Sequence, residues 1–168
     1  APKTLAEPWD NPGLMMGSLF EECTGVVTAL DLTFEVVAEA IENGCNLIVT
    51  HHPFFFTAIK SINIDEAKGA LIKKVLENGI TVYSAHTNVD ECDGGLCQTV
   101  AKMLGGENLN PNGVGVVCDI KPTTLGEFAK HVASVLSDDT VKFTGDANKK
   151  IKSMLCICGG GAGDSAYE

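Results

Sequence analysis

"NLIVTHHPFFF", residues 46–56, places two neighbouring histidines directly after an apolar run. Residues 46–50 do not alternate between polar and apolar side chains, which is typical of a strand covered on both faces of a sheet. Pro53 keeps His52 out of the helical region and favours extended backbone for the pair. From extended backbone, His51 and His52 project in different directions, so they can serve two metal ions, or one ion and a contact just beyond it. A structural role as half-buried polar residues is the alternative.

The segments on both sides of this strand predict alternating strands and helices. We expect two further strands at residues 23–30 and 80–84, and two helices at residues 34–43 and 66–78. Asp31 or Thr33 can cap the first helix and Asp65 the second, and Gly44 and Gly79 end them. This order predicts parallel strands joined by right-handed crossovers, and open sheets of this kind bind ligands at the carboxyl edge of the strands.

A second group of polar residues, in the sequence "AHTNVD", follows the strand at residues 80–84. His86, Asn88 and Asp90 alternate there, so they point to one side if the segment is extended. Because both strands end at the same edge of the sheet, we expect this group to converge with the two neighbouring histidines. Imidazole and carboxylate ligands together suit Zn, Mn, Fe or Ni. A polar turn, in which Asp90 makes local hydrogen bonds, is the alternative.

The second part of the chain follows a stretch rich in Gly, Asn and Pro at residues 105–113. We expect a first α/β lobe over residues 1–110 and the start of a second, incomplete α/β lobe over residues 111–168. Thr124 and Glu127 match the signature of a capping box at a helix start. The remaining predicted elements are helices at residues 95–104 and 123–136, and strands at residues 114–120, 140–145 and 151–158.

Three further motifs have a structural and a functional interpretation. "WDNPGLMMG", residues 9–17, is either a lid over the metal edge or a tight turn anchored by its Trp ring. "CGGGAGD", residues 158–164, offers backbone N–H groups for a phosphate, but no lysine follows, so a close strand-to-helix turn is favoured. The three phenylalanines at residues 54–56 are expected in the core or in a wall rather than in a binding motif.

The composition of the 168 residues indicates a globular protein and disfavours nucleic-acid binding. The formal net charge is −10, and all twelve cationic side chains are lysines, whereas nucleic-acid surfaces usually carry arginines. No apolar run approaches the roughly 20 residues of a membrane span, and no signal peptide is recognisable. The seven cysteines include no CxxC pair, so we expect reduced thiols in a cytoplasmic protein. Cys156 and Cys158 are a minor candidate for a soft-metal site.

Five motifs, in chain order, resemble those of the NGG-interacting-factor-three-like family, whose members are also called GTP cyclohydrolase 1 type 2 homologues. They are "WDNPGLMMG", "LDLT", "NLIVTHHPFFF", "NGITVYSAHTNVDECDGG" and "CGGGAGD". The resemblance implies a two-lobed α/β fold with mostly parallel strands and flanking helices. It also implies a dinuclear metal site at the carboxyl edge of the strands, in the cleft between the lobes, and assembly into a homo-oligomer, a ring-shaped hexamer.

The same resemblance assigns the site residues. His51 and His52 would each bind one of two divalent ions and Asp90 would join them as a ligand, while His86 and Asn88 would contact these ligands or the substrate. The family's helix before the Trp motif and its C-terminal His and Glu ligands are expected to be missing, since the last histidine here is His131. The implied function is metal-dependent hydrolysis of a nucleotide-like substrate. The alternative is a non-catalytic metal-binding or regulatory module.

Overall fold

The structure is a computed structural model that describes residues 1–113 and 115–160. The chain divides into two compact units, Ala1–Val89 and Asp90–Glu168. The sequence placed the change of lobe later, after residue 110. Among the described residues, no helix combines the length and the apolar character that crossing a membrane requires.

The first unit is built on a four-stranded sheet with the strand order β1-β4-β3-β2. These strands are β1 (Gly13–Met16), β2 (Val26–Ala29), β3 (Leu47–Thr50) and β4 (Thr81–Ser84). The β2–β3 and β3–β4 pairs are parallel, as the alternating order predicted. β1 pairs antiparallel with β4, and the sequence analysis missed this strand because it interpreted residues 9–17 as a lid or a turn.

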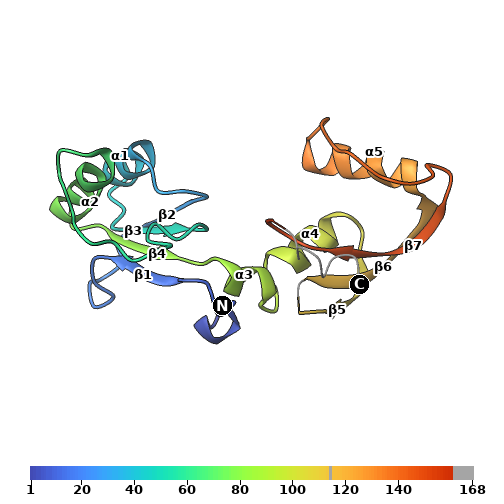
Figure 1. The fold of residues 1–168 in the computed structure, drawn as a ribbon, viewed down its shortest axis with the longest axis horizontal. Helices are drawn as coiled ribbons and strands as arrows, with labels where there is room; N and C mark the ends of the chain where they lie inside the picture. The colour runs from blue at the N-terminus through green and yellow to red at the C-terminus, as the bar shows by residue number, and fades with distance from the viewer. Residues whose placement is uncertain (114, 161–168) are drawn as a thin grey trace. The chain divides into compact units, whose positions relative to one another are not determined.

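Two helices, α1 (Phe34–Glu42) and α2 (Ala67–Glu77), connect the parallel strands and pack on the same face of the sheet (Figure 1). The Thr33 hydroxyl caps α1 by accepting a hydrogen bond from the Val36 N–H at 3.3 Å, as predicted. The predicted cap of α2 is wrong, because the helix begins after Glu66 and has no side-chain cap. The core between helices and sheet consists of Met16, Leu32, Val37, Ala40, Ile48, Leu71, Ile72, Val75, Ile80 and Val82.

The second unit contains a three-stranded antiparallel sheet with the order β5-β6-β7, so the parallel pairs among the described residues lie in the first unit. Its strands are β5 (Glu107–Pro111), β6 (Val116–Thr124) and β7 (Lys150–Cys156). β5 occupies the stretch that was predicted to be a linker. The predicted strand at residues 140–145 does not form: that segment is irregular, and β7 is an edge strand that pairs with β6.

The other helices of the described residues are the short 3-10 helix η1 (Lys3–Leu5) and the α-helices α3 (Thr87–Glu91), α4 (Leu96–Met103) and α5 (Leu125–Leu136). The predicted capping box at the start of α5 is confirmed, because the Thr124 hydroxyl and the Glu127 carboxylate each accept a hydrogen bond from the other residue's backbone N–H. The architecture is therefore a mixed α/β fold of parallel and antiparallel strands flanked by helices.

Candidate metal centre

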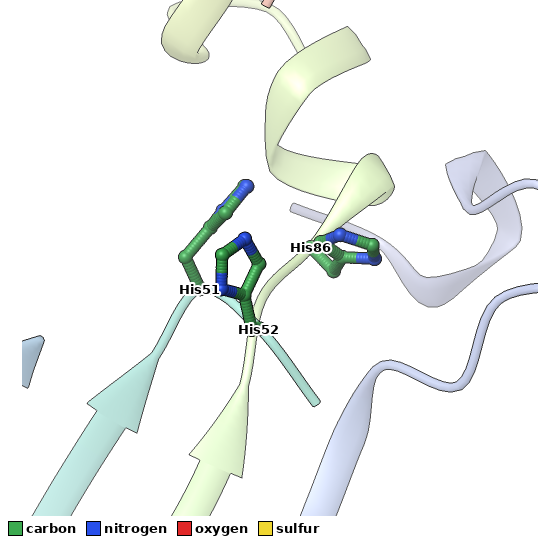
Figure 2. Close-up of side chains that lie close together, drawn as sticks. All are labelled: His51, His52 and His86. Atoms are coloured by element: carbon green, nitrogen blue, oxygen red, sulfur yellow. The ribbon is translucent and has the colours of Figure 1, made fainter. Parts of the chain in front are cut away.

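The carboxyl ends of two neighbouring strands position three histidines. Thr50, the last residue of β3, lies beside Ser84, the last residue of β4, in the parallel register. His51 and His52 therefore leave β3 next to the point where His86 follows β4, as Figure 2 shows. The convergence of the two motifs at one sheet edge was predicted from the strand order, and the structure confirms it.

Backbone and hydroxyl hydrogen bonds extend this edge beyond the strands themselves. The His51 N–H donates to the Ala29 carbonyl and the His52 N–H to the Leu30 carbonyl, both at 3.0 Å. The Thr50 hydroxyl lies 2.8 Å from the Ser84 hydroxyl and donates to the His52 carbonyl at 2.9 Å. The backbone that carries the neighbouring histidines is thus fixed on both sides before any ligand binds.

The three imidazoles form one compact group. Their ring centroids lie 5.2 Å apart for His51 and His52, 5.0 Å for His51 and His86, and 5.7 Å for His52 and His86. Each ring offers a nitrogen within 4.8 Å of the nitrogens of the other two, so one ion can contact all three. Over residues 1–113 and 115–160, no other group of three or more His, Cys, Asp or Glu residues brings its ligand atoms this close together.

Each histidine uses its Nδ1 atom for a hydrogen bond to an oxygen. The acceptors are the Ala85 carbonyl for His51 at 3.0 Å, an Asp31 carboxylate oxygen for His52 at 2.8 Å, and an Asp10 carboxylate oxygen for His86 at 2.8 Å. Carbonyl and carboxylate oxygens only accept hydrogen bonds, so Nδ1 carries the proton in all three rings. The lone pair is then on Nε2, the arrangement in which a histidine ligates a metal.

Two carboxylates beside the histidines were not assigned to the site from the sequence: Asp31, which was expected only as a helix cap, and Asp10. The Asp10 side chain is fully buried, and it also accepts hydrogen bonds from the Thr87 hydroxyl at 2.6 Å, the Thr87 N–H at 3.1 Å and the Asn11 N–H at 2.7 Å. Burial by itself raises the pKa of Asp10, but the hydrogen bonds from Thr87, His86 and Asn11 outweigh it and lower the pKa below its ordinary value. Asp10 is therefore an ionised acceptor for His86.

The missed strand explains how Asp10 reaches the site. Gly13, at the start of β1, lies opposite Ser84, at the end of β4, so the antiparallel pairing brings the loop before β1 to the segment after β4. The only local signal for this role was the turn-rich sequence around Trp9 and Asp10. A carboxylate that supports a histidine has no characteristic spacing from it, and the sequence analysis therefore left Asp10 unassigned.

The segment after His86 corrects one premise of the sequence analysis. Thr87–Glu91 is helix α3 and not an extended run, so Asn88 and Asp90 do not alternate along a strand with His86. Asn88 is fully buried, and its side-chain oxygen accepts a hydrogen bond from the His86 N–H at 2.9 Å. Asp90 belongs to the second unit, and its role as a ligand stays a prediction.

The cysteines of the second unit lie in a different environment. Cys97, Cys118 and Cys156 are free thiols buried in the core of that unit. Burial raises the pKa of Cys156, and burial together with a hydrogen bond to Cys97 raises the pKa of Cys158 to about 12. In the part of the chain that the structure describes, these cysteines belong to no group of three or more residues with metal-ligand spacing, so the soft-metal interpretation is not supported. The turn predicted at residues 158–164 lies largely outside the described residues.

Comparisons with known proteins agree on one family. A model of the Duf34/NIF3 (NGG1p interacting factor 3) family matches residues 1–168. A GTP cyclohydrolase 1 type 2 homolog of Clostridium acetobutylicum is 37% identical over 172 residues, which cover 96% of this chain and 64% of that relative. Another, from Halalkalibacterium halodurans, is 43% identical over 135 residues, covering 80% of this chain and 34% of the relative. The chain thus spans less than two thirds of the length of these curated relatives.

The crystal structure of the Staphylococcus aureus hypothetical protein SA1388 superposes with a TM-score of 0.88 at 31% identity. The match covers 99% of this chain and 70% of that protein. A Bacillus cereus protein related to NIF3 has a TM-score of 0.82 at 24% identity, covering 90% and 71% of the two chains. The first similarity extends to sequence and fold, and the second to the fold.

Proposed function

Since the chain belongs to the Duf34/NIF3 family, we propose that it binds a divalent metal ion and acts as a metal-dependent hydrolase on a nucleotide-like substrate. The observations that carry the metal site are the close spacing of its three histidines and the hydrogen bond from each Nδ1 to an oxygen, which leaves Nε2 as the ligand atom. The substrate class follows from the name that the relatives carry, GTP cyclohydrolase 1 type 2 homolog.

The donor set fits such an ion. Three neutral imidazole nitrogens suit Zn, Fe or Ni, and Mn where oxygen ligands join them. A divalent ion bound there would supply Lewis acidity, which lowers the pKa of water toward neutrality. His51, His52 and His86 would hold the ion, and Asp10 and Asp31 would keep two of the rings in the required tautomer and orientation. A second ion, with Asp90 as a further ligand, is part of the same proposal.

A non-catalytic metal-binding or regulatory module is the second candidate. Both carboxylates described beside the cluster, Asp10 and Asp31, are engaged in holding a histidine. A carboxylate in that role is not available as a general base, which a hydrolase would have to obtain from another group. This observation favours binding without turnover.

Bound metal tests the site. The protein and its variants are dialysed against Zn²⁺ and then against metal-free buffer, and the retained metal is measured. We expect the wild type to retain Zn²⁺ and His51→Ala to lose it, with Asp90→Ala reporting on the second ion. His131→Ala is the matched control, since His131 lies on α5, outside the cluster. Equal retention by His51→Ala and the wild type contradicts the proposed centre.

Turnover then separates the two candidates. A panel of nucleotides is incubated with metal-loaded protein, with chelated protein and with metal-loaded His51→Ala, and products are separated by chromatography. Metal-dependent turnover that is lost in His51→Ala supports the hydrolase. Retained metal without turnover of any nucleotide supports the module. We also propose that the chain assembles into a hexamer and is cytoplasmic. Light scattering of the purified chain tests the assembly.

A further inference from the structure

Two exposed aromatic rings lie against the histidine cluster. The Trp9 ring is 6.2 Å from the His86 ring and the Phe56 ring is 6.3 Å from it, both edge-on, and Trp9 and Phe56 are 5.9 Å apart. Trp9 is 60% exposed and Phe56 50% exposed. The two rings therefore form an apolar surface that adjoins the candidate metal ligands and remains open to solvent.

The two phenylalanines that precede Phe56 pack against the core instead. Phe54 and Phe55 are partly buried and pack against the core of the first unit, in ring contact with each other at 5.0 Å. Phe56 is half exposed, so half of its apolar ring stays in contact with solvent and does not contribute to the core. A single exposed aromatic residue is common, but a pair that meets beside a cluster of convergent polar nitrogens is typical of a ligand site.

Hydrogen bonds hold the loops that carry both rings. The Asn11 side chain donates to the Phe55 carbonyl at 2.5 Å, which links the Trp9 loop to the Phe56 loop. The Glu7 N–H donates to the Thr87 hydroxyl at 3.0 Å, which ties the Trp9 loop to the helix after His86. These hydrogen bonds hold the aromatic surface next to His86, so a ligand would meet it without first ordering these loops.

We propose that Trp9 and Phe56 form a stacking surface for a planar heteroaromatic ring, such as a nucleobase, and place that ring beside His51, His52 and His86. Aromatic rings offer their faces to any planar π-system, and such stacking tolerates differences in ring substituents. A metal ion on the histidines makes the neighbourhood positive, which disfavours an organic cation as the ligand. This inference rests on the proposed function and names the part of the substrate that these residues contact.

The chain contains a built-in reporter for this contact, because Trp9 is its only tryptophan. The Zn²⁺-loaded protein is titrated with guanosine, with ribose 5-phosphate and with choline, and tryptophan fluorescence is followed. We expect guanosine to quench the fluorescence of Trp9 and to bind, while ribose 5-phosphate and choline leave it unchanged. Quenching by choline at similar concentrations would assign the surface to a cation, and equal binding of ribose 5-phosphate would assign recognition to other groups. Either outcome overturns the proposal.

Variants separate stacking from metal binding. Phe56→Leu keeps the reporter and should weaken guanosine binding about tenfold, the loss expected for one stacking contact. Phe20→Leu is the matched control, since Phe20 is fully exposed in the loop between β1 and β2 and should leave binding unchanged. Variants of Trp9 lack the fluorescent reporter, so their guanosine binding is measured by calorimetry. Trp9→Leu should lose guanosine binding, and Trp9→Phe should retain it.

Retained Zn²⁺ is measured in every variant, so two failures can be told apart. Normal Zn²⁺ retention with unchanged guanosine affinity in Phe56→Leu and Trp9→Leu overturns the stacking surface and leaves the metal centre in place. Absence of Zn²⁺ from the wild-type protein overturns the proposed function itself. Normal Zn²⁺ retention with no guanosine binding by the wild type also overturns the stacking surface.

Discussion

His86 is held by a carboxylate that lies 76 residues earlier in the chain. This contact separates what the sequence could predict about the site from what it could not. His51, His52 and His86 could be placed from the sequence, because the end of each strand is a local pattern. The order of strands and helices then predicts that both strands end at the same edge of the sheet. Asp10 depends on a strand pairing that the sequence analysis did not predict, so its partner stayed hidden.

Substitution of Asp10 by Asn should weaken metal binding more than the same change at Asp31. One oxygen of Asp10 accepts two hydrogen bonds from Thr87, and an amide NH₂ in its place would face these donors. Asp10 is also fully buried, whereas the Asp31 side chain is 57% exposed and water can replace it. Loss of a carboxylate that orients a ligand typically costs about 10- to 100-fold in metal affinity.

Calorimetric titration with Zn²⁺ measures both effects. We expect a decrease of about 10- to 100-fold in affinity for Asp10→Asn and a smaller decrease for Asp31→Asn. Asp65→Asn is the control, because Asp65 lies in the exposed segment before α2, away from the three histidines, and its N–H donates to the Asn63 side chain. An unchanged affinity for Asp10→Asn would mean that His86 does not need this carboxylate to bind the ion.

At the scale of the element, the sequence predicted helices and parallel strands well and their boundaries less well. α1 and α5 carry their own start signals, Thr33 and the Thr124–Glu127 pair, and both signals act as predicted. α2 has no side-chain cap, and the Glu66 N–H before it donates to the Asn63 carbonyl instead, a contact that the sequence did not suggest. The stretch at residues 105–113 has the composition of a loop but pairs with β6, since the neighbouring strand supplies a ladder that propensity does not show.

Removal of the capping box should destabilise α5. Thr124→Ala removes the hydroxyl that accepts the Glu127 N–H, a loss of about 1 kcal/mol for an N-cap. Urea unfolding followed by circular dichroism measures the change in the free energy of unfolding. Thr144→Ala, in the exposed segment between α5 and β7, is the control and should have little effect. Equal stability of Thr124→Ala and the wild type would show that packing alone fixes the start of the helix.

The same capping box predicts a dependence on pH. Hydrogen bonds from the Thr124 backbone and side chain, and from Thr123, lower the pKa of Glu127 below its ordinary value. A carboxylate with a lowered pKa in the folded state stabilises the fold above the ordinary pKa of glutamate, and this contribution is lost as the pH falls through the lowered pKa. Glu127→Gln should therefore reduce the acid-dependent loss of stability, and an unchanged pH profile would contradict the role of the carboxylate.

At the scale of the whole molecule, each of the two units has a core of its own. Ile48 is fully buried in the first unit, and Val116 is buried in the second. The sequence predicted two lobes but placed the boundary by loop composition, whereas the division follows from which residues pack together. Packing between distant residues is not visible in a single sequence, and the boundary at residue 89 could not be predicted from it.

Ile48→Ala should destabilise the first unit by about 2–5 kcal/mol, the usual cost of truncating a buried isoleucine. Hydrogen exchange measured by mass spectrometry should show faster exchange in β3 and β4 and unchanged exchange in β6 and β7. Val116→Ala is the counterpart and should produce the opposite distribution. Equally faster exchange in both sheets for either variant would mean that the two units unfold as one.

The central claim is that His51, His52 and His86 bind a divalent ion through Nε2 while Nδ1 keeps its proton. Nuclear magnetic resonance of the protein with isotope-labelled histidine, recorded during a Zn²⁺ titration, tests it most directly. The account predicts that the Nε2 signals of these three residues shift, that their Nδ1 signals stay those of protonated donors, and that His131 is unaffected. Unchanged signals of the three histidines, or shifts that fall on their Nδ1 atoms, would contradict it.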